Sequence, residues 1–369
     1  MRLDDFIKNN YVCGEVTTGN VDFWEVYSNT RAISYGFKIG EKDYKVFAFI
    51  SFPTCKKPAK GYPVVVLMHG GNGAAYYEFT KKWADRGYIA IAPDFNAHTV
   101  ENFGSRYIAS EQGGPSGYGF SAVDTDLPWA FFSTLSAMKA IDVLLMQKNA
   151  DKNNVFSVGL SWGGYLNFLL MSQDKRIKAG SVIYSSAYTF CGEFGKTVLD
   201  GMREDVKKNY IENIEPTSYL KKITCPVLFT AGTQDHAFKM INRQKTADGI
   251  SGKAYYAIRK DFYHGNFYGF EQNESIDFCD AIRKNGRIPQ PKVVLLKNGG
   301  VKVKAYSENS RLNFLFTCDD IDKGQLQKWR SVLVASGDKI VLNKKCTAFF
   351  VTETMSDGSK WSSEMFKTE

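Results

Sequence analysis

The segment at residues 155–164 carries the residue pattern with the clearest chemical content in the chain. It reads VFSVGLSWGG, so Ser161 lies between Gly159 and Gly163, directly after an apolar run. Small residues on both sides of a serine allow the sharp turn from strand to helix that holds a nucleophilic hydroxyl above a sheet. The helix N-terminus at such a turn favours developing negative charge. The pattern therefore predicts Ser161 as the nucleophile of an acyl-transfer reaction.

A serine hydroxyl attacks well only when a neighbouring base removes its proton, and histidine is the usual base. Where a serine lies between a strand and a helix in this way, the acid and then the histidine follow it along the chain. Of the four histidines, only His236 and His264 come after Ser161. His264 follows the strand-like run at 253–258 and is predicted as the base, whereas His236 is expected on the wall of the cleft.

The carboxylate that orients the base is predicted at Asp235. It comes shortly after the apolar run at 226–230, where it would emerge at the carboxyl edge of a sheet. His236 adjoins Asp235 and is poorly placed to bind it while also facing the serine. The predicted triad is therefore Ser161, Asp235 and His264, and the segment after the fourth sheet strand offers the alternative acids Glu193, Asp200 and Asp205.

A tetrahedral intermediate needs preset N–H donors for its oxyanion, each contributing about 3–4 kcal/mol. One donor is predicted at the backbone N–H of Trp162, the residue after the nucleophile. The second is expected from the loop at 68–73, where Gly71 and Asn72 are equal candidates. His69 in the same loop is expected to orient it and to border the substrate.

A Gly-rich stretch at 112–119 lies inside a long segment, 95–127, that has little periodicity. Such a segment inside a compact domain predicts a lid or a binding loop, with a tolerated surface insertion as the alternative. The candidate substrate contacts are His69, Tyr118, Trp129 and His236, and the two aromatic residues fit core packing equally well. Asp94, at the end of another strand-like run, is expected to brace a loop.

These residues are positioned by alternating strand and helix patterns. The predicted helices cover 76–87 and 128–148, and residues 165–171 are predicted to begin a third. The predicted buried strands are continuous apolar runs at 63–68, 88–92, 154–158, 179–184, 226–230 and 253–258. Strands that alternate with helices predict an α/β fold with a mostly parallel sheet covered on both faces.

Different patterns flank this core. Apolar and polar residues alternate at 21–27, 33–37 and 44–50, which predicts an antiparallel meander within residues 1–60. After a Pro-bracketed segment near 287–291, short strands are predicted at 301–306, 312–317, 329–335, 339–342 and 347–352. We therefore predict a catalytic domain over 1–290 and a small β-sandwich over 291–369.

Composition narrows the classes of function. The 369 residues hold 47 Lys and Arg against 39 Asp and Glu, a net charge of +8. Residues 291–369 contain 13 basic and 9 acidic residues, net +4, which leaves +4 for residues 1–290. This excess is spread along the chain and forms no dense basic run, so a nucleic-acid partner is not expected.

The seven cysteines are far apart and lack CxxC spacing, so neither a zinc site nor a disulfide scaffold is expected. No apolar run reaches the roughly 18 residues of a membrane span, and we expect no membrane partner. The N-terminal residues carry early acids and no apolar signal core, so a cytoplasmic location is expected, although a secreted chain without its signal would read the same. The oligomeric state is not predicted.

The motifs together resemble the α/β-hydrolase superfamily, in particular its acetyl xylan esterase-like and dienelactone hydrolase/prolyl oligopeptidase-like members. The resemblance rests on His69-Gly70-Gly71, on Gly159-Leu160-Ser161-Trp162-Gly163-Gly164, on Gly232-Thr233-Gln234-Asp235-His236 and on Tyr263-His264-Gly265. In the tail, Lys328-Trp329-Arg330 and Asp357-Gly358 are similar to the Ig-like β-domain appended to such esterases. One departure is that Gly265 follows His264, where acetyl xylan esterases have an acidic residue.

The resemblance implies a serine esterase that removes short, acetyl-type acyl groups, with a carbohydrate as the expected alcohol and no cofactor. Its expected partner is a small-molecule or oligosaccharide ester. The first alternative is a peptidase or amidase of prolyl oligopeptidase type, although the roughly 50 residues before the core are too few for a propeller. The second alternative is an inactive scaffold whose β-domain binds a partner or a glycan.

Overall fold

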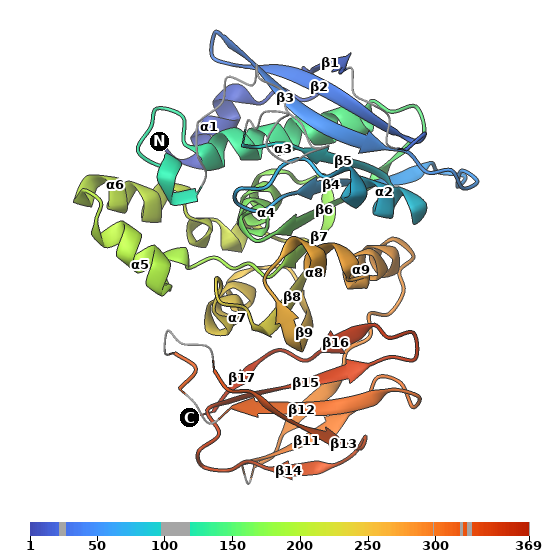
Figure 1. The fold of residues 1–369 in the computed structure, drawn as a ribbon, viewed down its shortest axis with the longest axis vertical. Helices are drawn as coiled ribbons and strands as arrows, with labels where there is room; N and C mark the ends of the chain where they lie inside the picture. The colour runs from blue at the N-terminus through green and yellow to red at the C-terminus, as the bar shows by residue number, and fades with distance from the viewer. Residues whose placement is uncertain (22–26, 97–118, 298, 318–319, 323–326, 369) are drawn as a thin grey trace.

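The computed structural model describes residues 1–21, 27–96, 119–297, 299–317, 320–322 and 327–368 (Figure 1). A twisted central sheet has the strand order β1-β2-β3-β5-β4-β6-β7-β8-β9, antiparallel from β1 to β5 and parallel from β5 to β9. Its strands are β1 Thr17–Asn20, β2 Thr30–Ile39, β3 Lys42–Ser51, β4 Tyr62–Met68, β5 Ile89–Pro93, β6 Ala150–Leu160, β7 Ile177–Ile183, β8 Val227–Gln234 and β9 Ala254–Tyr263.

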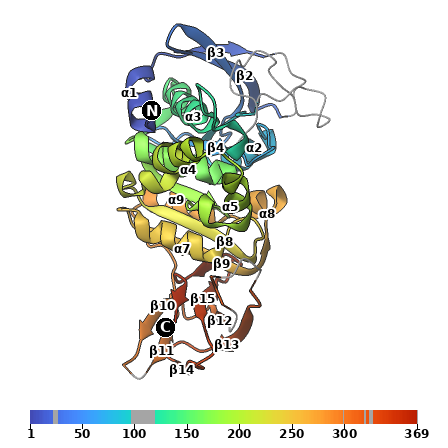
Figure 2. The same ribbon diagram turned by 90° about the vertical axis from the view of Figure 1, so that its left-hand side faces the viewer.

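Helices cover both faces of this sheet. They are α1 Leu3–Asn10, α2 Tyr77–Asp85, α3 Trp129–Leu145, α4 Trp162–Gln173, α5 Glu193–Asp200, α6 Glu204–Asn209, α7 Met240–Gly249, α8 Asn266–Glu271 and α9 Glu274–Arg283. Short helical turns add η2 Gly119–Ala122, η3 Thr189–Cys191, η4 Tyr210–Ile214, η5 Pro216–Ser218 and η6 Leu220–Lys222. Figure 2, which looks from the left-hand side of Figure 1, shows α3 and α4 stacked along one face of the strands.

The strand β4 shows why continuous apolar runs predict buried strands. Val64 and Val66 pack with α1, α3 and α4 in one apolar core, whereas Val65 and Leu67 pack with α2 and α9 in a second. Successive side chains of a strand point to opposite faces, so a strand with helices on both sides needs apolar residues at every position. The predicted α/β-hydrolase fold with its leading meander is confirmed.

The C-terminal strands form two layers. One layer contains β10 Lys292–Leu295, β11 Gly300–Lys304 and β14 Lys339–Val341. The other contains β12 Arg311–Thr317, β13 Arg330–Val334, β15 Ala348–Thr354, β16 Lys360–Ser362 and β17 Phe366–Lys367. Val301 and Val303 of the first layer pack against Phe314, Phe349 and Val351 of the second, which gives the expected small β-domain its own core.

This β-domain is joined to the central sheet by strand pairing. Ser362 of β16 pairs antiparallel with Tyr256 of β9, so the second layer continues the central sheet beyond its last parallel strand. Thr352 Oγ1 donates to the carbonyl of Ile258 at 2.8 Å across the same seam. The sequence predicts two separate units and gives no sign of this pairing.

The expected strand at 21–27 lies largely outside the described residues. No helix in the described ranges has the length and apolar character to cross a membrane.

Candidate active site

Ser161 occupies the sharp turn between β6 and α4. Its backbone has φ 56° and ψ −124°, a positive-φ conformation that a non-glycine residue adopts only when its surroundings enforce it. Close backbone contacts explain the flanking glycines: a Cβ at Gly159 would lie 2.1 Å from the carbonyl oxygen of Gly163, and one at Gly163 would lie 2.2 Å from that of Met68. The two glycines thus permit the turn that places the serine hydroxyl at the carboxyl end of β6.

Hydrogen bonds join the three residues of the predicted triad, which follow β6, β8 and β9. His264 Nε2 lies 2.8 Å from Ser161 Oγ, and His264 Nδ1 lies 3.1 Å from Asp235 Oδ1. An ionised carboxylate only accepts hydrogen bonds, so Nδ1 carries the ring proton and Nε2 accepts from the serine hydroxyl. The arrangement can remove the serine proton while Ser161 attacks a carbonyl carbon.

The carboxylate of Asp235 is buried but well supplied with donors. Oδ1 accepts from the backbone N–H groups of Ala237 at 2.8 Å and Phe238 at 3.0 Å, and Oδ2 pairs with Nη2 of Arg243 on α7. Burial raises the pKa of Asp235, but the charge of Arg243, followed by His264 and the backbone donors, outweighs burial and lowers the pKa below its ordinary value. Asp235 is therefore ionised at neutral pH and can stabilise a protonated His264.

Aromatic rings hold the imidazole of His264 between them. The Phe238 ring is nearly parallel to it, with centroids 6.0 Å apart, and the Tyr184 ring lies at 4.4 Å with a tilt of 46°. The Tyr184 hydroxyl also donates to the carbonyl of Gly265 at 2.6 Å, directly beside the histidine. These contacts limit rotation of the ring, so the bond to Ser161 is set by packing as well as by Asp235.

The loop after β4 passes beside the nucleophile. A Cβ on Gly70 would lie 3.0 Å from the Cβ of Ser161, and Asn72 turns the loop with φ 53°. Trp162 is the first residue of α4, at the end where a helix presents its N–H groups outward. Both predicted sources of oxyanion donors, Trp162 and the loop with Gly71 and Asn72, therefore border Ser161.

His69 lies buried behind this loop. Its Nε2 accepts from the backbone N–H of Phe95 at 2.9 Å, so Nδ1 carries the proton and donates to the carbonyl of Gly70 at 2.7 Å. Both ring nitrogens thus bind backbone, which orients the loop as the sequence leads us to expect. The expectation that His69 also borders the substrate does not fit this placement, because no ring nitrogen faces outward.

A cavity of about 370 Å³ lies next to Trp162 and Phe238. Its lining combines aromatic rings with polar groups, among them His236, Thr189 and Asn242. His236 is exposed, and its ring lies 5.6 Å from that of His264, so it stands on the cavity wall as expected. The mixed lining suits a small molecule with an apolar face and hydroxyl groups.

The other predicted contacts lie elsewhere. Trp129 is buried, its Nε1 donates to the carbonyl of Phe95 at 3.1 Å, and its ring meets the Trp162 ring edge-on at 6.3 Å. It therefore supports Trp162 from the core, which corrects the expectation that Trp129 touches substrate. Tyr118 lies outside the described residues.

The remaining carboxylates have structural partners. Asp94 is buried and accepts from the N–H groups of Ala75 at 3.3 Å and Asn96 at 2.8 Å, which braces the loops after β4 and β5. Of the alternative acids, Asp200 pairs with Lys207 and Asp205 with Arg203, both at the surface, and the side chain of Glu193 lies outside the described residues. Within the described ranges, no group of three or more His, Cys, Asp and Glu is arranged to hold a metal ion.

The sequence analysis missed Arg243, which is almost fully buried and pairs with Asp235. A signal exists, because Arg243 recurs at helical spacing with Met240 and Ala247, which are buried on α7 as well. A buried arginine needs a buried carboxylate partner. Asp235 stands eight residues before it, although only the fold shows that this carboxylate is the partner.

Comparisons with known proteins agree with the fold. The model of the family described as "Dienelactone hydrolase family" matches residues 52–287. No curated protein sequence matches the chain significantly. An acetyl xylan esterase from Paenibacillus sp. R4 is similar in structure at a TM-score of 0.57 and 16% identity, covering 72% of this chain and 88% of that chain.

Two further solved structures are also similar. Acetyl xylan esterase 1 from Thermoanaerobacterium sp. JW/SL YS485 has a TM-score of 0.59 at 15% identity, covering 76% of this chain and 92% of that chain. The acylaminoacyl peptidase of Pyrococcus horikoshii has a TM-score of 0.49 at 18% identity, covering 70% of this chain and 42% of that chain. At these identities, the likeness to the esterases establishes the shared fold alone.

Proposed function

Since the chain belongs to the dienelactone hydrolase family and is a hydrolase, we propose that it is a serine esterase that removes short acyl groups, of acetyl type, from carbohydrate alcohols. The observation that carries the proposal is the hydrogen-bonded series from Ser161 Oγ through His264 to Asp235, at a strained turn. Such a turn is maintained against its backbone cost of roughly 1–3 kcal/mol only where the surrounding structure enforces it, and it is typical of functional sites.

The proposed reaction has two halves. In the first, His264 Nε2 takes the proton of Ser161 while Oγ bonds to the ester carbonyl carbon, and the N–H donors beside Ser161 receive the oxyanion. The protonated His264 then gives its proton to the departing alcohol oxygen, which leaves an acyl-serine. In the second half, water gives a proton to His264 and attacks the acyl carbon, and the acid leaves as Ser161 recovers its proton.

The size and chemistry of the neighbouring cavity support a small substrate. Its volume of about 370 Å³ is close to the lower end of ligand pockets, roughly 300–1,000 Å³. Phe238 and Trp162 offer apolar rings to the flat face of a sugar or to a short acyl chain, and Asn242 and Thr189 offer hydrogen-bonding groups to hydroxyls. A long acyl chain has no polar groups for these partners.

The decisive experiment measures hydrolysis of p-nitrophenyl acetate by the full chain and by Ser161→Ala. We expect kcat to fall by at least about 10⁴-fold in the variant, because loss of the nucleophile removes covalent catalysis. Ser28→Ala is the matched control, since Ser28 is exposed and distant in sequence from the triad. Equal loss in both variants, or none in Ser161→Ala with an unchanged circular dichroism spectrum, would contradict the proposal.

A substrate series decides between the proposal and its alternatives. It compares p-nitrophenyl esters from acetate to octanoate, acetylated xylan, feruloylated sugars and peptide amides. Preference for acetate and release of acetate from the glycan support the carbohydrate esterase. Preference for octanoate contradicts it, peptide cleavage at a comparable rate supports the peptidase alternative, and a folded protein without any of these activities supports the inactive scaffold.

A further inference from the structure

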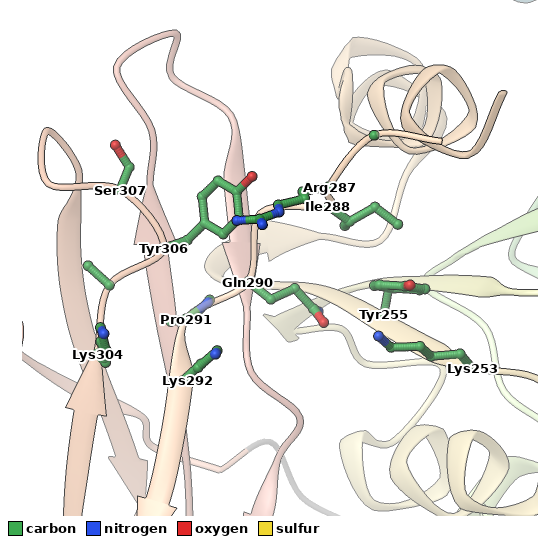
Figure 3. A pocket seen from close by; sticks show the side chains of 12 residues that line it. Lys253, Tyr255, Arg287, Ile288, Gln290, Pro291, Lys292, Lys304, Tyr306 and Ser307 are labelled. Carbon is green, nitrogen blue, oxygen red and sulfur yellow. The ribbon is translucent and has the colours of Figure 1, made fainter. Parts of the chain in front are cut away.

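A second, larger cavity of about 990 Å³ lies where the catalytic part meets the β-domain (Figure 3). Figure 3 shows side chains from three segments around it. These are Lys253 and Tyr255 where β9 begins, Arg287 to Lys292 in the connecting segment, and Lys304 to Ser307 at the end of β11 and directly after it. Neither Ser161, Asp235 nor His264 lines this cavity.

The lining of this cavity carries positive charge and no carboxylate. Its charged side chains are Lys253, Arg287, Lys292 and Lys304, and all four are exposed. In the part of the chain that the structure describes, none of the four forms an ion pair with an acidic side chain; Lys253 instead lies 4.8 Å from the centroid of the Tyr255 ring. An anion entering the cavity would therefore meet several cations with no competing acid in the wall.

The β-strands place like charges directly opposite one another. Lys292 of β10 pairs in register with Lys304 of β11, and Lys302 of β11 pairs with Lys339 of β14. Lys302 and Lys304 are two residues apart, so they share one face of the sheet, and the exposed face continues the positive lining of the cavity. Like charges directly opposite destabilise a sheet, so an anion bound to this face would offset that repulsion.

The walls of the cavity are held by hydrogen bonds. Gln290 Nε2 donates to the carbonyl of Ser362 at 3.0 Å, which fixes the connecting segment to the seam between the two parts. The buried Glu353 accepts from the backbone N–H groups of Tyr306 and Ser307, both at 2.9 Å. The loop that carries Tyr306 is therefore ordered before any ligand binds, which lowers the entropy lost on binding.

The cavity and the candidate active site lie at opposite ends of one strand. Lys253 immediately precedes β9, whereas His264 immediately follows it. A strand of this length spans roughly 30 Å at about 3.3 Å per residue. A small ligand in the cavity therefore does not contact the reacting ester. Only a long substrate chain could occupy both sites at once.

We propose that this cavity and the adjoining lysine face bind an acidic oligosaccharide, whose carboxylate or sulfate groups pair with Lys253, Arg287, Lys292 and Lys304. Tyr306, with an exposed fraction of 42%, offers a ring on which a sugar face can rest. The choice of a glycan over another polyanion rests on the proposed carbohydrate esterase function, since a phosphodiester chain carries no carboxylic ester for Ser161. Binding here would raise the local concentration of acylated polymer at the active site.

The test is calorimetric titration of the full chain carrying Ser161→Ala, which cannot turn over the ligand. The probes are a tetramer of galacturonic acid, a sulfated tetrasaccharide, neutral xylotetraose and a single-stranded DNA oligonucleotide. We expect an acidic tetrasaccharide to bind, with about tenfold weaker binding after Lys292→Gln/Lys304→Gln is added. Lys56→Gln/Lys57→Gln, which removes two exposed charges from another surface loop, is the matched control and should leave the affinity unchanged.

Each outcome decides the matter. Binding of the uronate tetramer identifies carboxylates as the recognised groups, and binding of the sulfated tetramer alone identifies sulfates; both support the site. Equal binding of xylotetraose, tighter binding of DNA, no binding at all, or equal loss in the control overturns it. Because Ser161→Ala is used, failure of the esterase proposal, seen as unchanged p-nitrophenyl acetate hydrolysis in Ser161→Ala, remains distinguishable from failure of this one.

Discussion

The two ends of β9 (Figure 1) differ in whether their charged groups have partners within the protein. At its carboxyl end, the buried Asp235 has Arg243, His264 and two backbone N–H groups around it, so every charge has a partner inside the protein. At its amino end, Lys253 begins an exposed cationic region in which Lys292 and Lys304 face each other. Burial makes an unpaired charge costly, whereas water and salt screen exposed charges. The fold therefore supplies all the charge partners of Asp235, whereas the cations around Lys253 would find theirs in a bound ligand.

The largest effect should come from breaking the completed site at its carboxylate. Asp235→Asn keeps the shape of the side chain but leaves His264 without the acceptor that selects its tautomer, so kcat for p-nitrophenyl acetate should fall by about 10⁴-fold. Asp205→Asn, at an exposed alternative acid, should change kcat by no more than about twofold. Steady-state kinetics on both variants measure this, and a similar loss in Asp205→Asn would assign the acid differently.

The next largest effect should come from Arg243, and it tests whether this residue positions Asp235 or only stabilises the fold. Arg243→Met leaves the carboxylate of Asp235 buried without its cation, which should lower the free energy of unfolding at pH 7 by about 3–5 kcal/mol. We also expect kcat to fall by about 10- to 100-fold, because Asp235 orients His264 less well. Arg259→Met breaks another ion pair, with Glu274, and should lower stability while leaving kcat nearly unchanged. Equal kcat losses in both variants would indicate a general structural effect.

The ion pair of Asp235 and Arg243 predicts how the stability of the fold depends on pH. The pKa of Asp235 is lowered in the folded protein, so its ionised form contributes stability above the unfolded-state pKa of about 3.9, and this contribution is lost as pH falls through the lower, folded-state pKa. Arg243→Met removes the largest of the contributions that lower the pKa of Asp235, so we expect this pKa to rise and the stabilisation by the ionised form to shrink. The difference in melting temperature between the two proteins should therefore be largest near pH 7 and shrink toward pH 3. A constant difference would show that the charge of Arg243 is not what matters.

Salt should affect glycan binding at one end of β9 more strongly than ester hydrolysis at the other. Raising ionic strength from about 0.01 M to 0.1 M shortens the screening length from roughly 30 Å to 10 Å. Binding of the acidic tetrasaccharide should weaken about tenfold, since its partners are exposed cations, whereas kcat/KM for the neutral p-nitrophenyl acetate should change less than about twofold. Calorimetry and kinetics in the same buffers test this. Salt-independent glycan binding would argue against ion pairing in the cavity.

The smallest effect concerns stability at the cationic end. Lys304→Glu converts the facing pair with Lys292 from like to opposite charge, which should raise the melting temperature by about 1–2 °C while weakening glycan binding about tenfold. Lys56→Glu, at an exposed lysine outside the sheet, is the control and should leave both unchanged. Differential scanning calorimetry measures the shift. A lower melting temperature in Lys304→Glu would mean that the two lysines do not repel each other in the free protein.

The sequence predicts the catalytic end well because its signals are local. The turn at Ser161, the apolar runs of β4 to β9 and the positions of Asp235 and His264 after strand ends all follow from short-range pattern and spacing. Trp129 shows where such reasoning stops, since an aromatic residue near a motif packs into the core or faces a cleft according to which helix face it lies on. His69 likewise has a ring nitrogen, Nε2, that is bound by the backbone N–H of Phe95, which only the fold brings near it.

By itself, the sequence determined the succession of the buried strands, the sharp serine turn and the order of nucleophile, acid and base, because backbone preference and hydrophobic period act over a few residues. Only the tertiary structure decided that Arg243 neutralises Asp235, that β16 extends the central sheet at β9, and that a dispersed net charge gathers around one cavity. Lys253, Arg287, Lys292 and Lys304 come from three separate segments, and they form no dense run in the sequence. Their meeting depends on how two packed layers are joined, and packing is a long-range property that local pattern does not encode.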